Sequence, residues 1–225
     1  LRRLGVEAAA AEALANPVLP CRPGATDPLH RRFAAFLTHS IAVACAAEML
    51  ADAHPLGVSA EEAFTAGLLH DMGKLAMLTA MPKTYARVLD ALRSEHGDIA
   101  ETERRVLGAD HAVVARRLAE HWNLPPGVAE AAWLHHQPLE AIPESVRRPE
   151  RVALIGLADA LVRRLRIGYS GNFEFPRTPA QLAAPLGIAE DLLEDVAARL
   201  PDRAAAAADA VALEGELPLA DFCET

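Results

Sequence analysis

Seven side chains that can ligate a metal constrain this chain most, because all of them lie in alanine- and leucine-rich stretches. They are His39, His70, Asp71, His111, His135, His136 and Asp159. Imidazole and carboxylate bind borderline divalent cations, and seven such groups exceed what one tetrahedral zinc needs. They suit two metal ions about 3.5–4 Å apart that share a bridging carboxylate. The set therefore predicts a two-metal site inside a helical bundle.

The composition favours helices throughout the chain. Hydrophobic residues make up 52% of the 225 residues but aromatic residues only 4%, so the core must be built from Ala, Leu and Val. A β-sandwich would require more β-branched and aromatic residues. The sequence contains no strand pattern of useful length, and we predict an all-α fold, a helical bundle with the metal site in its core.

The charge distribution argues against a nucleic-acid groove. The chain carries 22 basic and 31 acidic residues, a net charge of −9, and no block of Lys and Arg. Three scattered cysteines, Cys21, Cys45 and Cys223, fit a reducing compartment. The sequence also lacks an uninterrupted run of about twenty apolar residues of the kind that spans a membrane. We therefore expect a cytoplasmic protein with no membrane or nucleic-acid partner.

Prolines, glycines and capping motifs divide the chain. We expect the end of an upstream helical element and a loop over residues 1–28, a helical core over 29–170, and a C-terminal loop and helical extension over 171–225. The start at Leu1 is not an initiator Met, so we expect the native chain to begin upstream. Capping boxes at Ser59 and Thr178 predict helix starts. Further helices are expected over about 29–53, 82–96, 99–107, 111–122 and 127–136, and from Pro149 through Asp159.

The two adjacent ligand pairs set a geometric condition. A single buried His is more often an ordinary core residue, so the prediction depends on the pairs His70-Asp71 and His135-His136. Neighbours on a regular helix point about 100° apart, so both members of a pair reach one cluster only at a helix end. Gly73 is expected to end or bend the first helix, and Pro138 prevents the second from continuing. Asp71, which adjoins a candidate His, is the better bridging carboxylate.

These motifs resemble those of the HD superfamily of metal-dependent phosphohydrolases. His39, His70-Asp71 and Asp159 match its H…HD…D pattern. The segments 62–74, 107–111, 122–125 and 135–138 are similar to the HDOD subgroup, and the resemblance covers roughly residues 30–170. It implies an all-helical domain of bacterial signalling proteins, many of which have lost the metal-binding residues that this chain retains.

The complete ligand set is also similar to the dinuclear site of the HD-GYP phosphodiesterases, which hydrolyse cyclic dinucleotides. That similarity implies that all seven side chains are metal ligands, with Asp71 bridging, and that Lys74 contacts the phosphate. The chain departs from the pattern in two ways. Residues 137–140 replace the Gly-Tyr-Pro sequence that contacts cyclic di-GMP, and Ala35 replaces a Glu that supplies a third metal in some members. A dinuclear site with a different substrate is expected.

The expected activity is phosphoester hydrolysis by a metal-activated water, with Asp71 and Lys74 as catalytic residues and a phosphorylated small molecule or nucleotide as substrate. Two divalent ions are expected, with iron or manganese favoured and zinc, nickel or magnesium open. Two alternatives remain. One is a non-catalytic HDOD signalling domain with a structural metal site and a protein partner, and the other is a di-iron oxygenase. We expect four histidines to lie outside the site: His30, His54, His96 and His121. Four arginines are expected mostly on a solvated face, and any of them near the metals would be a substrate contact: Arg116, Arg117, Arg163 and Arg164.

Overall fold

The fold is available as a computed structural model that describes residues 28–95, 97–172 and 176–210. Every regular element in these ranges is helical, which confirms the all-α prediction. The elements are α2 (Pro28–Ala53), α3 (Ala60–Leu69), α4 (Met72–Ala80), α5 (Pro82–Glu95), α6 (Ile99–Leu107), α7 (His111–His121), α8 (Pro126–Leu134), η1 (Leu139–Ala141), α9 (Pro149–Leu165), α10 (Pro179–Ala183), η2 (Ala184–Leu186) and α11 (Glu190–Ala210). Residues 1–27 of the expected upstream element lie outside the described residues.

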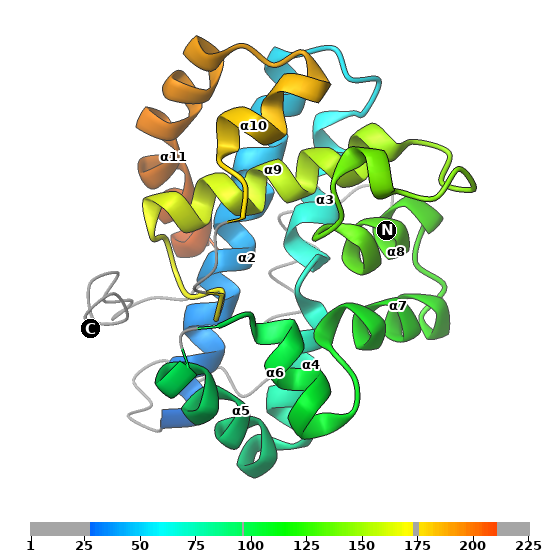
Figure 1. The fold of residues 1–225 in the computed structure, drawn as a ribbon. Helices are drawn as coiled ribbons and strands as arrows, with labels where there is room; N and C mark the ends of the chain where they lie inside the picture. The colour runs from blue at the N-terminus through cyan, green and yellow to red at the C-terminus, as the bar shows by residue number, and fades with distance from the viewer. Residues whose placement is uncertain (1–27, 96, 173–175, 211–225) are drawn as a thin grey trace.

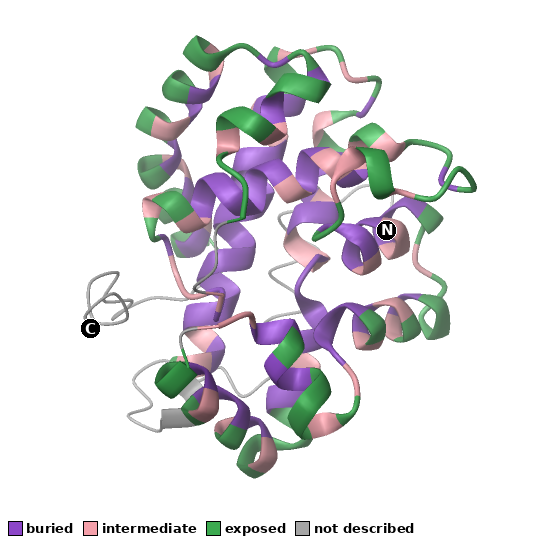
Figure 2. Cartoon of the chain, viewed as in Figure 1, coloured by how far each residue is buried: buried purple, intermediate pink, exposed green. Residues whose placement is uncertain are grey.

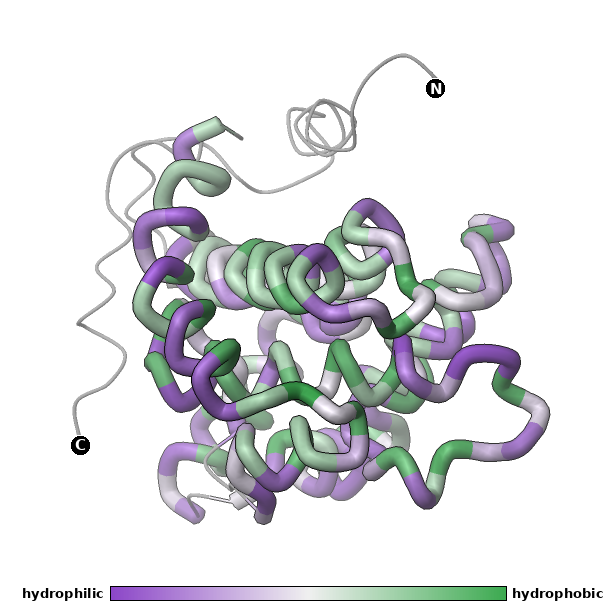
Figure 3. The backbone as a smooth tube through the Cα atoms, turned by 90° about the horizontal axis from the view of Figure 1, so that it is seen from above, coloured by the Kyte–Doolittle hydropathy of each residue, from purple (hydrophilic) through white to green (hydrophobic). Residues whose placement is uncertain are grey.

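Helix α2 forms the centre of the bundle. It packs against α3, α9 and α11, and α9 crosses it (Figure 1). Every side chain from Ile41 to Ala47 is buried, and five of these residues are alanine or cysteine, so neighbouring helices approach closely (Figure 2). By length and composition alone, the segment Arg31–Ala53 could cross a membrane, but 83% of its apolar window is buried inside this fold. Hydrophilic residues gather on the outer turns (Figure 3).

The predicted capping boxes are both present. The Ser59 hydroxyl accepts a hydrogen bond from the Glu62 N–H at 3.1 Å, and the Glu62 carboxylate accepts one from the Ser59 N–H at 3.4 Å. Thr178 and Gln181 make the same reciprocal pair at 3.2 and 2.9 Å. These bonds satisfy N–H groups that a helix start leaves without partners, which explains why the sequence located both starts correctly.

The prediction for Gly73 was wrong. Helix α3 ends at Leu69 and α4 begins at Met72, so the chain breaks at His70-Asp71 and Gly73 is the second residue of a helix that we did not predict. A Cβ at Gly73 would lie 2.0 Å from the carbonyl oxygen of His111. The glycine therefore lets α4 approach the start of α7, and this contact brings Asp71 towards His111.

Candidate metal centre

The structure brings all seven candidate ligands into one cluster from five parts of the chain, with six of them buried and His136 exposed. His39 lies in α2, His70 and Asp71 lie between α3 and α4, His111 begins α7, His135-His136 follow α8, and Asp159 lies in α9. Their ligand atoms form three overlapping groups whose members lie within 4.8 Å of one another: His39, His70 and Asp159; His70, Asp71 and His135; and His111, His135 and His136. This convergence is what a metal site shared by several helices requires.

Asp71 lies between the two sides of the cluster. Its Oδ2 is 3.3 Å from His70 Nε2, whereas its Oδ1 is 3.6 Å from His111 Nε2 and 3.7 Å from His135 Nε2. The two oxygens therefore face different histidines. A carboxylate placed in this way can join two cations, one through each oxygen.

Several buried polar atoms in the cluster lack a hydrogen-bond partner among the described residues. They are His39 Nδ1, His70 Nε2, Asp71 Oδ1 and His135 Nε2. The opposite nitrogens of two of these rings face backbone carbonyls: His70 Nδ1 is 2.7 Å from Gly67 O, and His135 Nδ1 is 3.2 Å from Ala131 O. A carbonyl only accepts, so each Nδ1 carries a proton, and in the neutral form of each ring the Nε2 lone pair points into the cluster. Unsatisfied buried lone pairs are costly, and a divalent cation fits them.

The ionisation of the cluster also suits a cation. Burial opposes the charge of Asp71, but His70 and Lys74 hold the pKa of this carboxyl well below its usual range. Burial likewise opposes the charge of Asp159, and the bond from His39 together with the charge of Arg163 holds its pKa well below normal. Burial lowers the pKa of His135 to about 3, so its ring is neutral at neutral pH. Ionised carboxylates and neutral imidazoles are the forms that ligate metals.

Lys74 reaches the cluster through Asp71. Its Nζ donates to Asp71 Oδ2 at 2.6 Å and to the Ser170 carbonyl oxygen at 2.9 Å, and the side chain is buried. The ammonium thus balances the charge of Asp71 in this structure. Its expected contact with a phosphate stays a prediction.

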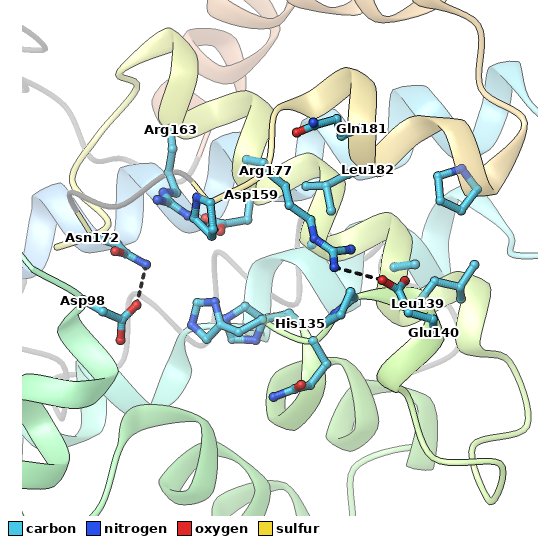
Figure 4. Close-up of a pocket in the computed structure, with 18 residues that line it drawn as sticks. Asp98, His135, Leu139, Glu140, Asp159, Arg163, Asn172, Arg177, Gln181 and Leu182 are labelled. Atoms are coloured by element: carbon cyan, nitrogen blue, oxygen red, sulfur yellow. Dashed lines mark hydrogen bonds and ion pairs between the residues drawn. The ribbon is translucent and has the colours of Figure 1, made fainter.

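An open pocket of about 250 Å³ leads to the cluster. His135, His136 and Asp159 line it, and Figure 4 shows Arg163 and Arg177 on the side formed by α9 and the start of α10. The pocket also contains apolar side chains, including Leu139 and Leu182. Candidate ligands that line an open pocket are accessible to a small molecule.

Sequence reasoning missed one residue of this pocket and placed another wrongly. The expectation that Arg163 lies on a solvated face was wrong: its side chain is 9% exposed, and its Nη1 is 3.4 Å from Asp159 Oδ2. Its position four residues after Asp159 on one helix is a signal that could have found it. Arg177, on the segment before α10, had no such signal. Its Nη2 is 2.9 Å from Glu140 Oε1.

The structure describes the side chains of two of the four histidines that the sequence analysis placed outside the site. His54 Nε2 lies 3.2 Å from the Leu186 carbonyl oxygen, and His121 is exposed at the end of α7. His96 and the side chain of His30 lie outside the described residues.

Several solved structures resemble this fold. An HDOD domain protein of unknown function from Geobacter sulfurreducens is 22% identical with a TM-score of 0.67, and the match covers 79% of this chain and 62% of that one. A Shewanella amazonensis SB2B protein, provisionally named a phosphohydrolase, is 23% identical with a TM-score of 0.65, over 93% and 70% of the two chains. A Marinobacter aquaeolei VT8 protein, provisionally named a signal transduction protein, is 23% identical with a TM-score of 0.70, over 95% and 46%.

These similarities establish the fold. This chain spans less than two thirds of the Geobacter protein, and no curated protein has a significant match to it. The sequence itself matches the family described as HDOD domain over residues 1–138, more than half of the chain. The H…HD…D resemblance is thereby confirmed at the level of the subgroup, and the chain belongs to the HDOD domain family.

Proposed function

We propose that this chain is a metal-dependent phosphohydrolase of a bacterial signalling system, acting in the cytoplasm on a phosphoester. The observation that carries the proposal is the convergence of partnerless buried ligand atoms from His70, Asp71 and His135 beside an open pocket. A purely structural core would have no reason to leave these atoms unsatisfied. The name of the similar Shewanella protein agrees with the proposed hydrolysis, and the name of the similar Marinobacter protein agrees with the proposed role in signalling.

The residues divide into two ligand sets. His39, His70 and Asp159 would hold one divalent ion, and His111, His135 and His136 the other, with Asp71 between them. Two such ions supply a hydroxide at neutral pH and positive charge for phosphoryl oxygens. Iron or manganese is favoured because the set contains imidazole and carboxylate but no thiolate. Lys74, whose ammonium lies beside Asp71, is proposed as a further contact for the phosphoryl group.

The pocket favours a compact substrate. Its volume of about 250 Å³ lies below the roughly 300–1,000 Å³ of sites that enclose drug-sized ligands. Arg163 and Arg177 can hold an anionic group, because a guanidinium matches phosphate oxygens in a bidentate manner. Leu139 and Leu182 offer apolar surface to an organic leaving group. A phosphorylated small molecule or a mononucleotide suits this space better than a cyclic dinucleotide does.

The test combines metal analysis with a substrate panel. Protein reconstituted with Mn²⁺, or with Fe²⁺ under reducing conditions, would be assayed for metal content and for hydrolysis of an aryl phosphodiester, mononucleotides and cyclic di-GMP. We expect two metals per chain, turnover of a compact phosphoester, and little turnover of cyclic di-GMP. Metals in place without turnover of any substrate would favour the non-catalytic signalling domain. Oxygen consumption by the Fe²⁺ form in place of hydrolysis would favour the oxygenase.

A further inference from the structure

A buried carboxylate lies directly behind one of the candidate ligands. Glu103, on α6, has no solvent-exposed surface. Its Oε2 accepts a hydrogen bond from the backbone N–H of His111 at 2.7 Å. The same oxygen lies 2.6 Å from His111 Nδ1. Its Oε1 accepts a hydrogen bond from the hydroxyl of Tyr85, on α5, at 2.7 Å. Three helices thus meet at this carboxylate, and its position depends on all three.

These contacts determine which nitrogen of His111 carries the proton. An ionised carboxylate can only accept, so the short contact with Glu103 requires a proton on Nδ1. In the neutral ring Nε2 then carries the lone pair, which in this structure can accept a hydrogen bond from His136 Nε2–H. This nitrogen lies 2.9 Å from His136 Nε2 and 3.6 Å from Asp71 Oδ1, on the side where a cation would lie. Glu103 therefore sets both the tautomer and the direction of the ring.

Two other candidate ligand rings, those of His70 and His135, are oriented by the backbone instead. Backbone carbonyls of Gly67 and Ala131 face Nδ1 of His70 and His135, so no side-chain substitution removes those contacts. The contact to His111 comes from a side chain, and Tyr85 holds that side chain in place. Burial and the adjacent charge of Glu103 raise the pKa of Tyr85 well above normal, so its hydroxyl remains a donor at neutral pH.

We propose that Glu103, held by Tyr85, is a positioning residue for metal binding through His111. The proposal rests on the proposed metal site and adds to it the residues that prepare one ligand for the cation. A carboxylate behind a ligating histidine fixes its tautomer and raises its basicity, and its loss typically costs 10–100-fold in metal affinity. Because the pair lies on α5 and α6, outside the seven ligands, it can be changed while every ligand stays in the chain.

The experiment compares three variants of the full chain. Glu103→Gln keeps the size of the side chain and removes the charge, Tyr85→Phe removes only the hydroxyl, and Glu101→Gln repeats the first change at an exposed position of the same helix. Mn²⁺ affinity would be measured by competition with a chelator, and thermal unfolding would verify the fold. In metal-free protein, long-range ¹H–¹⁵N NMR correlations of His111 would report its tautomer.

We expect Glu103→Gln to weaken Mn²⁺ binding by about 10–100-fold and to reduce the Nδ1–H tautomer. Tyr85→Phe should weaken Mn²⁺ binding only several-fold, because Glu103 keeps both of its contacts to His111 and loses only the hydrogen bond from Tyr85. Glu101→Gln should match the wild type. Equal affinity in the wild type and Glu103→Gln, or a wild-type ring protonated at Nε2, would overturn this inference alone. A wild type that binds no metal would overturn the proposed function. If Glu103→Gln fails to fold, the Tyr85→Phe comparison decides: an unchanged Mn²⁺ affinity overturns the inference.

Discussion

Asp71 makes its short contact with Lys74 through one oxygen only: Oδ2 lies 2.6 Å from the Lys74 Nζ, whereas Oδ1 has no hydrogen-bond partner among the described residues. The ammonium neutralises the carboxylate without occupying the oxygen that faces His111 and His135. A buried carboxylate with one oxygen left free can bind a cation through that oxygen and so act as a bridging ligand. The roles of Asp71 and Lys74 can therefore be tested separately.

Asp71 and Lys74 should have separable effects on metal binding and turnover. Asp71→Ala should lose both metals, because it removes the proposed bridge. Lys74→Met should keep them and lose turnover, since methionine fills similar space without supplying a charge to the phosphoryl group. Metal content and phosphoester hydrolysis would be measured on the same samples. Normal metal content in Asp71→Ala would refute the bridging role.

Gly73→Ala should disturb the metal centre from outside it. The new Cβ would lie 2.0 Å from the His111 carbonyl oxygen, so α4 and α7 must separate. Overpacking of this kind typically costs about 1–3 kcal/mol in the free energy of unfolding. We expect lower stability in urea and weaker Mn²⁺ binding. Gly97→Ala is the control, because a Cβ there meets nothing within 4 Å. Equal effects of the two substitutions would contradict the close approach at Gly73.

Arg163→Gln should weaken substrate binding if the arginine holds an anionic group in the pocket. We expect KM to rise about tenfold, equivalent to about 1.4 kcal/mol, with a smaller change in kcat. Arg164→Gln, at the exposed neighbour on the same helix, should leave both constants unchanged. Metal analysis is needed beside the kinetics because Arg163 also contacts Asp159. An unchanged KM with normal metal content would remove Arg163 from the substrate site.

The metal-free protein should lose stability as the solution is acidified. Burial lowers the pKa of His135 from 6.5 to about 3, so below pH 6.5 the unfolded chain takes up a proton that the folded chain does not. The stability from the neutral ring is therefore present above pH 6.5 and is lost towards pH 3, by up to about 1.4 kcal/mol per pH unit. Burial opposes the charge of His70, but Asp71 outweighs burial and raises the pKa of His70. The contribution of His70 to stability therefore changes with pH in the opposite direction to that of His135.

The measurement is urea unfolding with a chelator present between pH 5 and pH 7.5, before the carboxylates titrate. His135→Gln should show a shallower decline than the wild type, since it removes the group whose folded-state pKa is lowered. A control at the exposed His121, His121→Gln, should keep the wild-type slope. Identical slopes for the wild type and His135→Gln would show that this ring does not control acid stability.

Local chemistry made the helical fold and the set of candidate ligands predictable from the sequence. An Ala- and Leu-rich composition favours helices wherever it occurs, and the boxes at Ser59 and Thr178 depend on residues only three positions apart. The ligand side chains could be chosen in the same way, because imidazole and carboxylate bind metals wherever the chain places them. Adjacent pairs such as His70-Asp71 also required a break in the helix, which the structure contains.

Contacts between helices decided the rest. The break occurs at His70-Asp71 itself, and Gly73 serves a contact with α7 that is distant in sequence. Glu103 resembles any other glutamate of a short amphipathic helix until α5 and α7 place Tyr85 and His111 against it. The direction in which each oxygen of Asp71 points likewise depends on the packing of α7 and α8. Residue types and short-range bonds are properties of the sequence, whereas the distances between side chains far apart in it arise only when the helices pack.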